Sequence, residues 1–393
     1  MDHSSIRASN IDVKRLNRNR VFRYINRHGR LSKPEIAQAL GMSSPTVLFI
    51  TNELIEKGLL REEGEFESSG GRKAKAISPN HDARFAFGLD ITCNHLGVVL
   101  TNLSGVVIKH IRKKKRFENT GQYWQFLAES LTSFKSDTSV ADEKILGVGI
   151  ALPGIIDMRR RRLTYSHVLN VFDVPCEEIS RDIPFPVAFT NDANAAALAE
   201  LNNRQDYTQA IYLSLSNSVG GAIIFRKDQF LGQKRDDDAW QNDNLLIGDN
   251  FKGGEIGHMA LIPGGKQCYC GKRGCFDSYG NAKILSQFTD GNLEAFFRRL
   301  QEGEPAFKAE WERYLDNLAY MINNLRMLAD CKVIVGGYVG GFIESYLEDL
   351  KARLRFLDTF GDDGSYVEAC TYRFEASALG AALLHIEAYI NTI

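Results

Sequence analysis

The sequence predicts an α/β protein in which a small, mainly helical N-terminal module precedes a larger body of strands and helices. The first 80 residues hold 14 Lys and Arg against 9 Asp and Glu, whereas the rest of the chain holds 34 against 40. Only from residue 81 onward do short apolar runs typical of buried strands alternate with helical patterns. A chain of 393 residues is also long enough for two or three domains.

The composition, with 44% hydrophobic and 25% charged residues, is that of a globular protein with a substantial core. The chain has no apolar run of about 18 residues, the length a membrane helix needs, and its N-terminus is polar and basic where a signal peptide is apolar. We therefore expect a cytoplasmic protein without a membrane partner. Four widely spaced cysteines are expected to be buried free thiols: Cys93, Cys176, Cys331 and Cys370.

The N-terminal module is predicted to contain three helices. Residues 14–27 place apolar side chains at roughly helical spacing among five arginines, which predicts an amphipathic helix with a basic face. In the next helix, Ser32 is the expected N-cap, Glu35 completes a capping box, and Gly41 ends the helix. After a three-residue turn, Ser43 or Ser44 can cap a third helix.

The second and third of these helices predict a helix-turn-helix whose last helix enters the major groove of DNA. The basic charge of the module supports a nucleic-acid partner, although a plain αα-hairpin would show the same helix pattern. The side chains expected to face the DNA bases are Ser44, Pro45, Thr46, Phe49 and Asn52.

A hairpin-like stretch follows the helices, and its positive, glycine-containing tip spans residues 68–73. Such a wing can lay Arg72 and Lys73 along a phosphate backbone or into a narrow minor groove. We therefore predict that residues 1–80 form a winged helix-turn-helix that binds double-stranded DNA.

The body begins with antiparallel strands over residues 85–91, 96–102 and 106–108, followed by a helix over 121–135 and a buried strand over 145–151. A strand over 187–190 leads into Asn191 and Asp192, at the start of an alanine-rich helix. Open α/β sheets tend to place ligand groups at such strand ends. A second series of strands and helices starts at residue 210, and a helix of small residues over 376–384 ends the pattern.

One histidine and three cysteines fall within 18 positions, on short turns rich in glycine. His258, Cys268, Cys270 and Cys275 match the set that satisfies a tetrahedral Zn²⁺ without an open coordination position. We therefore predict one structural zinc ion per chain. The alternative is a disulfide or scattered core thiols, but a Cys-x-Cys pair does not easily bridge to itself.

Several motifs of the body together closely resemble the ROK family of sugar kinases and sugar-responsive repressors, and the resemblance extends over almost the whole chain. They are Gly149-x3-Pro153-Gly154, Asn191-Asp192-Ala193-Asn194, Gly254-Glu255-Ile256-Gly257-His258, Cys268-x-Cys270-Gly271-x2-Gly274-Cys275 and Gly336-Gly337. An N-terminal winged helix on such a body looks like the repressor branch, whose members respond to xylose, glucose or N-acetylglucosamine-type sugars.

The resemblance implies a body of two actin/hexokinase-like (ribonuclease-H-like) lobes with the sugar between them. The first lobe would comprise residues 81–191 plus 371–393, and the second would comprise residues 192–370. The resemblance also implies a homodimer or a homotetramer.

The family's sugar contacts map onto Asn191, Asp192, Glu255 and His258, with the second ring nitrogen of His258 on the zinc. Carboxylate and amide groups suit this role because they form paired hydrogen bonds with vicinal hydroxyls. In the family's kinases, the position of Asp192 holds the general base. Asp277 stands where the family usually has Glu, and its shorter side chain bears on which sugar is bound.

The nucleotide half of the site departs from the family's kinases. Where those enzymes have Asp-x-Gly-Gly-Thr, this chain has Asp-Ile-Thr-Cys-Asn at residues 90–94. The second phosphate loop, residues 214–221, keeps only Gly220 and Gly221. Since backbone approach to phosphate depends on such glycines, we predict a binding protein without kinase activity.

We thus expect a repressor of a carbohydrate operon whose binding to operator DNA is modulated by a sugar or phosphosugar. An active sugar kinase with an appended DNA-binding domain, and a repressor controlled by a protein partner, remain as alternatives. The segment 226–253 is longer than the hairpin expected there. It is either a solvated excursion or a lid that brings Trp240 over the sugar.

Overall fold

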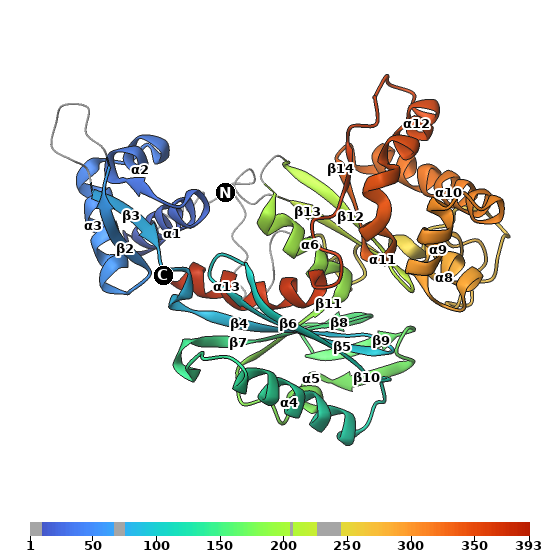
Figure 1. The fold of residues 1–393 in the computed structure, drawn as a ribbon. Helices are drawn as coiled ribbons and strands as arrows, with labels where there is room; N and C mark the ends of the chain where they lie inside the picture. Colours follow the sequence, from blue (N-terminus) through green and yellow to red (C-terminus); the bar gives the residue numbers. More distant parts are fainter. Residues whose placement is uncertain (1–9, 67–74, 205–206, 226–244) are drawn as a thin grey trace, which may run out of the picture.

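The computed structural model describes residues 10–66, 75–204, 207–225 and 245–393. Figure 1 shows the N-terminal module at one side of a two-lobed body, with the C-terminus beside the module. Among the described residues, no helix combines the length and the apolar character needed to cross a bilayer. Arg72, Lys73 and Trp240 lie outside the described residues, so the predictions for the wing tip and the lid stay predictions.

The N-terminal module has the predicted helices and wing strands. Ser32 Oγ accepts a hydrogen bond from the amide of Glu35, whose carboxylate accepts one from the Ser32 amide, so the capping box is confirmed. Gly41 ends the helix with φ +61°, and Ser43 caps the next helix. The elements are α1 (Asn10–His28), β1 (Leu31–Ser32), α2 (Lys33–Leu40), α3 (Ser44–Glu56), β2 (Leu60–Glu65) and β3 (Lys75–Pro79), with strand order β1-β3-β2.

Lobe 1, as we call the part of the chain from β4 to β11, is built on a five-stranded sheet. The strands are β4 (Phe85–Ile91), β5 (His95–Asn102), β6 (Val107–Lys114), β7 (Ile145–Leu152) and β11 (Val187–Asn191), in the order β11-β7-β4-β5-β6. Strands β11, β7 and β4 are parallel, so β4 and β11 end at the same edge as β7. The last residues of these strands are therefore brought together.

Helix α4 (Gly121–Ser136) covers the face of this sheet opposite to that covered by α13 (Ala376–Thr392), as Figure 1 shows. A small antiparallel sheet and a short helix complete lobe 1: β8 (Ile155–Asp157), β9 (Arg162–Ser166), β10 (Val171–Pro175) and α5 (Cys176–Ser180).

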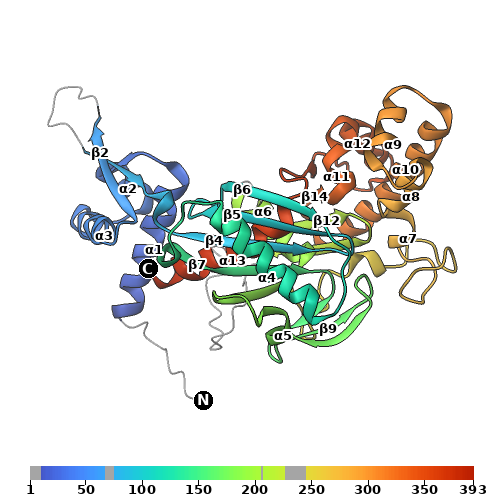
Figure 2. The same ribbon diagram turned by 60° about the horizontal axis from the view of Figure 1, so that its bottom comes forward.

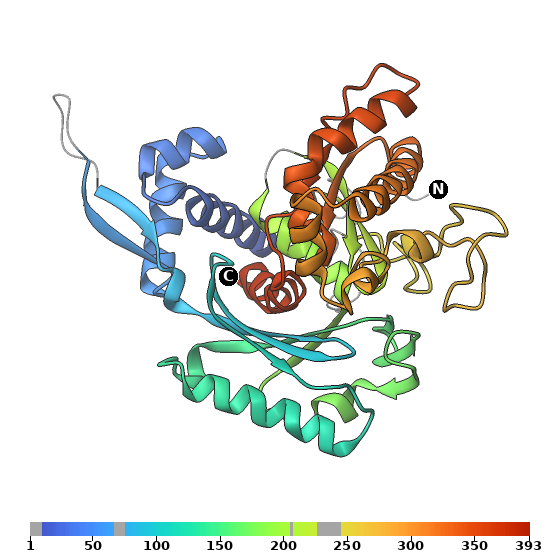
Figure 3. The ribbon, with the colours of Figure 1, turned by 45° about the vertical axis from the view of Figure 1, so that its right-hand side comes forward.

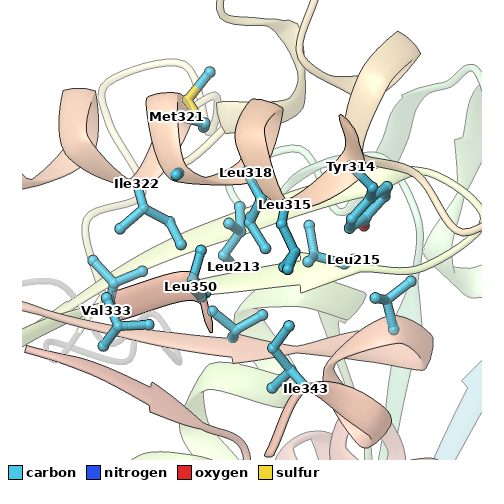
Figure 4. Packing of buried hydrophobic residues seen from close by; sticks show 14 of the residues in the cluster. Leu213, Leu215, Tyr314, Leu315, Leu318, Met321, Ile322, Val333, Ile343 and Leu350 are labelled. Carbon is cyan, nitrogen blue, oxygen red and sulfur yellow. The ribbon is translucent and has the colours of Figure 1, made fainter. Parts of the chain in front are cut away.

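Lobe 2, from α6 to β15, is built on a four-stranded sheet in the order β13-β12-β14-β15. Its core lies between this sheet and the long helix α10, where Leu315 and Leu318 face Leu213 of β12 (Figure 4). The elements are α6 (Asp192–Asn203), β12 (Gln209–Leu215), β13 (Val219–Phe225), α7 (Asp277–Gly280), α8 (Lys283–Ser286), α9 (Leu293–Gln301), α10 (Pro305–Ala329), β14 (Lys332–Gly336), α11 (Gly337–Ile343), α12 (Leu347–Leu357) and β15 (Val367–Ala369).

The backbone of helix α13 is in direct contact with the backbone of both lobes. A Cβ on Gly149 of β7 would lie 1.9 Å from the carbonyl oxygen of Ala381, and a Cβ on Gly380 would lie 1.6 Å from that of Ala195 in α6. Both positions therefore require glycine. Figure 3 shows α13 nearly end-on between the two lobes.

Candidate functional site

The predicted metal ligands come together in the loop before α7. The ligand atoms of His258, Cys268, Cys270 and Cys275 all lie within 4.8 Å of one another. Nδ1 of His258 is 3.9 Å from Sγ of Cys268, and Sγ of Cys270 is 3.7 Å from Sγ of Cys275. That sulfur separation excludes a disulfide between Cys270 and Cys275, and the spacing of the four ligand atoms suits one small tetrahedral ion. The residues present therefore fit a metal ion held by one nitrogen and three sulfurs.

Asn191 and Asp192 stand where β11 ends and α6 begins, as predicted. Asn191 is the N-cap: its Oδ1 accepts from the amides of Ala193 (2.9 Å) and Asn194 (3.1 Å), and its Nδ2 donates to Gly154 O (3.1 Å). Asp192 is the first residue of α6. Most of the hydrogen-bonding capacity of Asn191 is thereby used within the protein.

Asp192 lies close to two other carboxyl groups, those of Asp90 and Glu255. Burial raises the pKa of Asp192, although the amide of Ala193 donates a hydrogen bond to it. Burial and the charge of Asp192 raise the pKa of Asp90 to about 7, and the same two causes raise the pKa of Glu255. Among the described residues, the Glu255 carboxylate has no hydrogen-bond or ion-pair partner. This cluster has acceptor capacity that a polyhydroxylated ligand could use.

Asp277 differs from these carboxylates because both of its oxygens accept hydrogen bonds within the protein. The residue is also buried, with only 1% of its surface exposed. Its Oδ2 accepts a 2.6 Å hydrogen bond from the amide of Val219, and its Oδ1 accepts one from Nδ2 of Asn281 (3.1 Å). Burial raises the pKa of Asp277, against the effect of these hydrogen bonds. The structure thus uses this side chain to tie the metal loop to the β12–β13 turn.

A group of aromatic rings from both lobes, which the sequence did not reveal, lies beside the metal cluster. The ring of His167, after β9 of lobe 1, is 5.9 Å from that of His258 and 5.4 Å from that of Tyr269, between centroids. Tyr165 bonds Nδ1 of His167 through its hydroxyl at 2.8 Å. The sequence could not have paired residues about a hundred positions apart without the fold.

In each of the two expected phosphate loops, two backbone amides are engaged within the protein. In the β4–β5 turn, the His95 amide donates to Oγ1 of Thr92 (3.0 Å), and the Thr92 amide donates to His95 O (3.0 Å). In the β12–β13 turn, Ser216 N donates to Ser218 O (3.3 Å), and Val219 N is held by Asp277. A phosphate group would have to displace these bonds.

A second contact between the lobes, also missed from the sequence, lies on the β6 side. Arg112 donates to the hydroxyl of Tyr338 at 2.8 Å, and its guanidinium lies 5.3 Å from the centroids of the Tyr338 and Phe374 rings. A pocket of about 400 Å³ adjoins it, lined in part by Asp90, His95 and Glu375. Tyr338 directly follows Gly336-Gly337, so this contact lies at a family motif.

On the N-terminal module, the predicted DNA contacts on α3 are mostly solvent-facing. Ser44, Pro45, Phe49 and Asn52 are exposed, whereas the hydroxyl of Thr46 is hydrogen bonded to that of Ser43 at 2.8 Å. Leu48, which is not among the predicted DNA contacts, is 47% exposed. Spacing could have identified it, since it lies on the same helix face as Pro45, Phe49 and Asn52.

The module is fastened to α13. Arg23 of α1 forms an ion pair with Glu387 (2.7 Å) and donates to Oδ1 of Asn391 (3.2 Å). One hydrophobic cluster contains core residues of the module, such as Phe22, and residues of α13, such as Ile386. Figure 2 shows α1 against the C-terminal end of α13. The packing of α13 on both lobes thus continues into the module.

Comparison with known proteins agrees with this architecture. A model described as ROK family matches residues 86–235 and 238–388, and one described as winged helix-turn-helix DNA-binding matches residues 15–61. The xylose repressor of Bacillus subtilis (strain 168) is 25% identical over 276 residues, which are 70% of this chain and 67% of that protein. The N-acetylglucosamine repressor of Escherichia coli O157:H7 is 27% identical over 284 residues, 71% and 66% of the two chains. The alignments thus span about two thirds of these relatives' lengths.

Solved structures show the same fold. A ROK family transcriptional regulator, described as a homolog of the E. coli MLC protein, superposes with a TM-score of 0.73 at 20% identity, over 97% of this chain and 98% of that chain. A ROK hexokinase from Thermus thermophilus gives a TM-score of 0.57 at 25% identity, over 78% and 99%. The chain therefore belongs to the ROK family and carries that family's two-lobed α/β body behind an N-terminal winged helix-turn-helix.

Proposed function

We propose that this protein is a transcriptional repressor of a carbohydrate uptake or catabolism operon, and that a sugar or phosphosugar bound between the lobes modulates its binding to operator DNA. The observation that carries the proposal is the position of α13, which packs on both lobes and also holds α1 of the N-terminal module. The names of the repressor relatives support the proposal.

The sugar is proposed to bind at Asp192, Glu255 and His258, with Asn191 and Asp277 holding the surrounding backbone. Asp192 begins α6, and α6 meets α13 through the close approach at Gly380. A shift between the lobes would therefore move α13 and, through Arg23, the DNA-binding helices. The sugar can change operator affinity only by binding the two arrangements with different affinity.

The metal of the His258, Cys268, Cys270 and Cys275 cluster is proposed to be a structural Zn²⁺. Four protein ligands leave no position for a reacting water, so the ion would fix the loop that carries Glu255 and His258. We further propose that the protein works in the cytoplasm as a homodimer or homotetramer, which would present two winged modules to two half-sites.

Kinase activity is not part of the proposal, since two backbone amides in each of the β4–β5 and β12–β13 turns, among them those of His95 and Val219, already bond within the protein. Phosphoryl transfer depends on backbone and charged groups that position the nucleotide. A coupled assay with ATP and a panel of hexoses and N-acetylhexosamines is expected to give no turnover. Measurable phosphorylation would establish the kinase alternative instead.

The central test is a fluorescence-anisotropy titration of the full-length protein on the promoter DNA adjoining its gene, with and without pentoses, hexoses, N-acetylhexosamines and their 6-phosphates. One sugar is expected to change the operator affinity. Asp192→Asn should shift that response to sugar concentrations roughly 10- to 100-fold higher and leave sugar-free DNA binding intact. Asp182→Asn, at an exposed carboxyl, should change neither. DNA binding that ignores every sugar would contradict the effector proposal and favour control by a protein partner.

A further inference from the structure

Helix α3 presents an unusual stripe to solvent. Pro45, Leu48, Phe49 and Asn52 lie at positions i, i+3, i+4 and i+7, which puts them on one face of the helix. Leu48 is 47% exposed and Phe49 is 64% exposed. The opposite face is the buried one, made by Val47, Ile50, Thr51 and Leu54. The stripe is therefore not part of the core of the module.

The side chains that commonly read guanine are absent from this helix. The sequence of α3, SPTVLFITNELIE, contains no Arg, Lys, Gln or His. The hydroxyls of Thr46 and Thr51 are also used within the protein, by Ser43 Oγ (2.8 Å) and by Val47 O (2.8 Å) respectively. What the stripe offers to a base pair is thus two large apolar side chains and the amide of Asn52.

In the major groove, these groups match A·T pairs. The thymine C5-methyl is an apolar contact for side chains such as Phe, and an Asn amide can accept from adenine N6 while donating to N7. Guanine and cytosine present no methyl group there. Burying a thymine methyl group against an apolar side chain is favourable. Burying the polar edge of another base there costs free energy, because no hydrogen bond replaces its bonds to water.

Positive charge beside the stripe favours DNA over an apolar peptide as its partner. Nζ of Lys33, at the start of α2, donates to Oδ1 of Asn52 at 3.4 Å and pairs with Glu62 at 3.5 Å, and the Asn52 oxygen keeps a second lone pair for a base. The first 80 residues carry five more basic than acidic side chains. A lysine at this place can contact a phosphate while α3 enters the groove. The lysine would then contact the phosphate backbone of the DNA, while the apolar side chains of α3 contact its bases.

We infer that α3 reads A·T base pairs, with Leu48 and Phe49 packed against thymine methyl groups and Asn52 bonded to an adjacent adenine. The inference rests on the proposed function as a DNA-binding repressor and names the base composition of its half-sites. Leu48 and Phe49 determine sequence preference, whereas the basic residues around them supply affinity for any duplex.

The first experiment selects duplexes from a random-sequence library with the full-length protein. It is expected to recover a repeated half-site with A·T pairs where α3 contacts the groove. Each thymine is then replaced by deoxyuridine, which removes only the methyl group. Replacement at a contacted position should weaken binding about fourfold, the effect of exposing one methyl-sized group. Replacement outside the half-sites should have no effect.

The second experiment combines these probes with variants. Phe49→Ala and Leu48→Ala should each lose the penalty for removing one particular methyl, because the contact is already gone. Asn52→Ala should likewise lose the penalty for 7-deazaadenine at one adenine. Leu328→Ala, which changes a leucine that is 66% exposed on α10, is the matched control and should keep every penalty.

The outcomes separate this inference from the function on which it rests. If the selection yields no preferred sequence, the proposed repressor function fails. If it yields half-sites with G·C pairs at the α3 positions, bound equally well with deoxyuridine, the function stands and the inference is overturned. Unchanged DNA binding by Phe49→Ala together with insensitivity to deoxyuridine would assign the stripe to a protein partner, which also overturns it.

Discussion

The two ends of the region between the lobes use their polar side chains in opposite ways. At the acidic end, formed by Asp192 and Glu255 beside the metal cluster, pKa values are raised, and Glu255 has no partner among the described residues. At the clasped end, formed by Arg112, Tyr338 and Phe374, the side chains bond to one another across the lobes. Asp90 lines the same pocket as Arg112, and its pKa is raised by burial and by the charge of Asp192, so it is linked to both ends.

This difference indicates where a ligand can act. At the acidic end a ligand has only to displace water from the exposed Glu255 carboxylate, whereas at the clasped end it must first break contacts that already exist within the protein. The family motifs do not make this distinction, since both ends contain them. Four changes test the comparison, in order of decreasing expected effect.

Loss of a metal ligand should have the largest effect on stability. Cys275→Ser is expected to remove a stoichiometric zinc from the purified protein and to lower the Tm by about 10 °C or more, because the binding energy of a structural metal is folding energy. Metal content by mass spectrometry and a thermal scan measure both effects. Cys176→Ser, at a buried cysteine outside the cluster, should leave the zinc content unchanged. A wild-type protein that carries no zinc would contradict the assignment of the ion.

Asp192→Asn tests the acidic end directly. Removing one charge while keeping the shape should weaken sugar binding by roughly 10- to 100-fold, the range for a hydrogen bond to a charged group. Calorimetry with the sugar that shifts operator binding measures the change. An unaltered affinity would show that the sugar does not bind at Asp192, and it would contradict the assignment of the acidic end as the ligand site.

Asp90→Asn tests the carboxyl between the ends by its pH dependence. The folded-state pKa of Asp90, about 7, lies above its ordinary value, so the folded protein holds a proton that the unfolded chain releases. The stabilisation is complete below the unfolded pKa and is lost as pH rises through about 7. Relative to wild type, Asp90→Asn should therefore gain Tm as the pH is raised from 6 to 8, by a few degrees. A difference in Tm that stays constant over this range would show that Asp90 ionises normally.

Arg112→Ala should have the smallest effect, because its contact with Tyr338 is exposed. We expect a loss of about 1 kcal/mol in the free energy of unfolding, from one hydrogen bond and a cation–π contact. Nucleotide binding, followed by the fluorescence of a labelled ATP, is expected to be absent from this variant, since the amides of His95 and Val219 in the two turns remain engaged. ATP binding by this variant would show that the contact between Arg112 and Tyr338, and not the two turns, prevents nucleotide binding.

Much of the architecture could be predicted because it depends on local patterns. The capping box at Ser32 and Glu35, the strand ending at Asn191, and the spacing from His258 to Cys275 each lie within a short stretch whose geometry follows from residue type. The predictions for Asn191 and Asp277 as sugar contacts remain untested. The structure shows, however, that both side chains also hold the backbone.

Sequence alone determined the order of modules, and it predicted the His/Cys cluster that the fold brings together, since each follows from neighbouring residues. Only the tertiary structure decided which side chains have unused bonding capacity. Arg112 reaches Tyr338 across 226 positions, His167 reaches the metal loop from the other lobe, and Leu48 faces solvent because other residues of α3 fill the core. Long-range contacts are set by the packing of whole elements, and no local pattern records them.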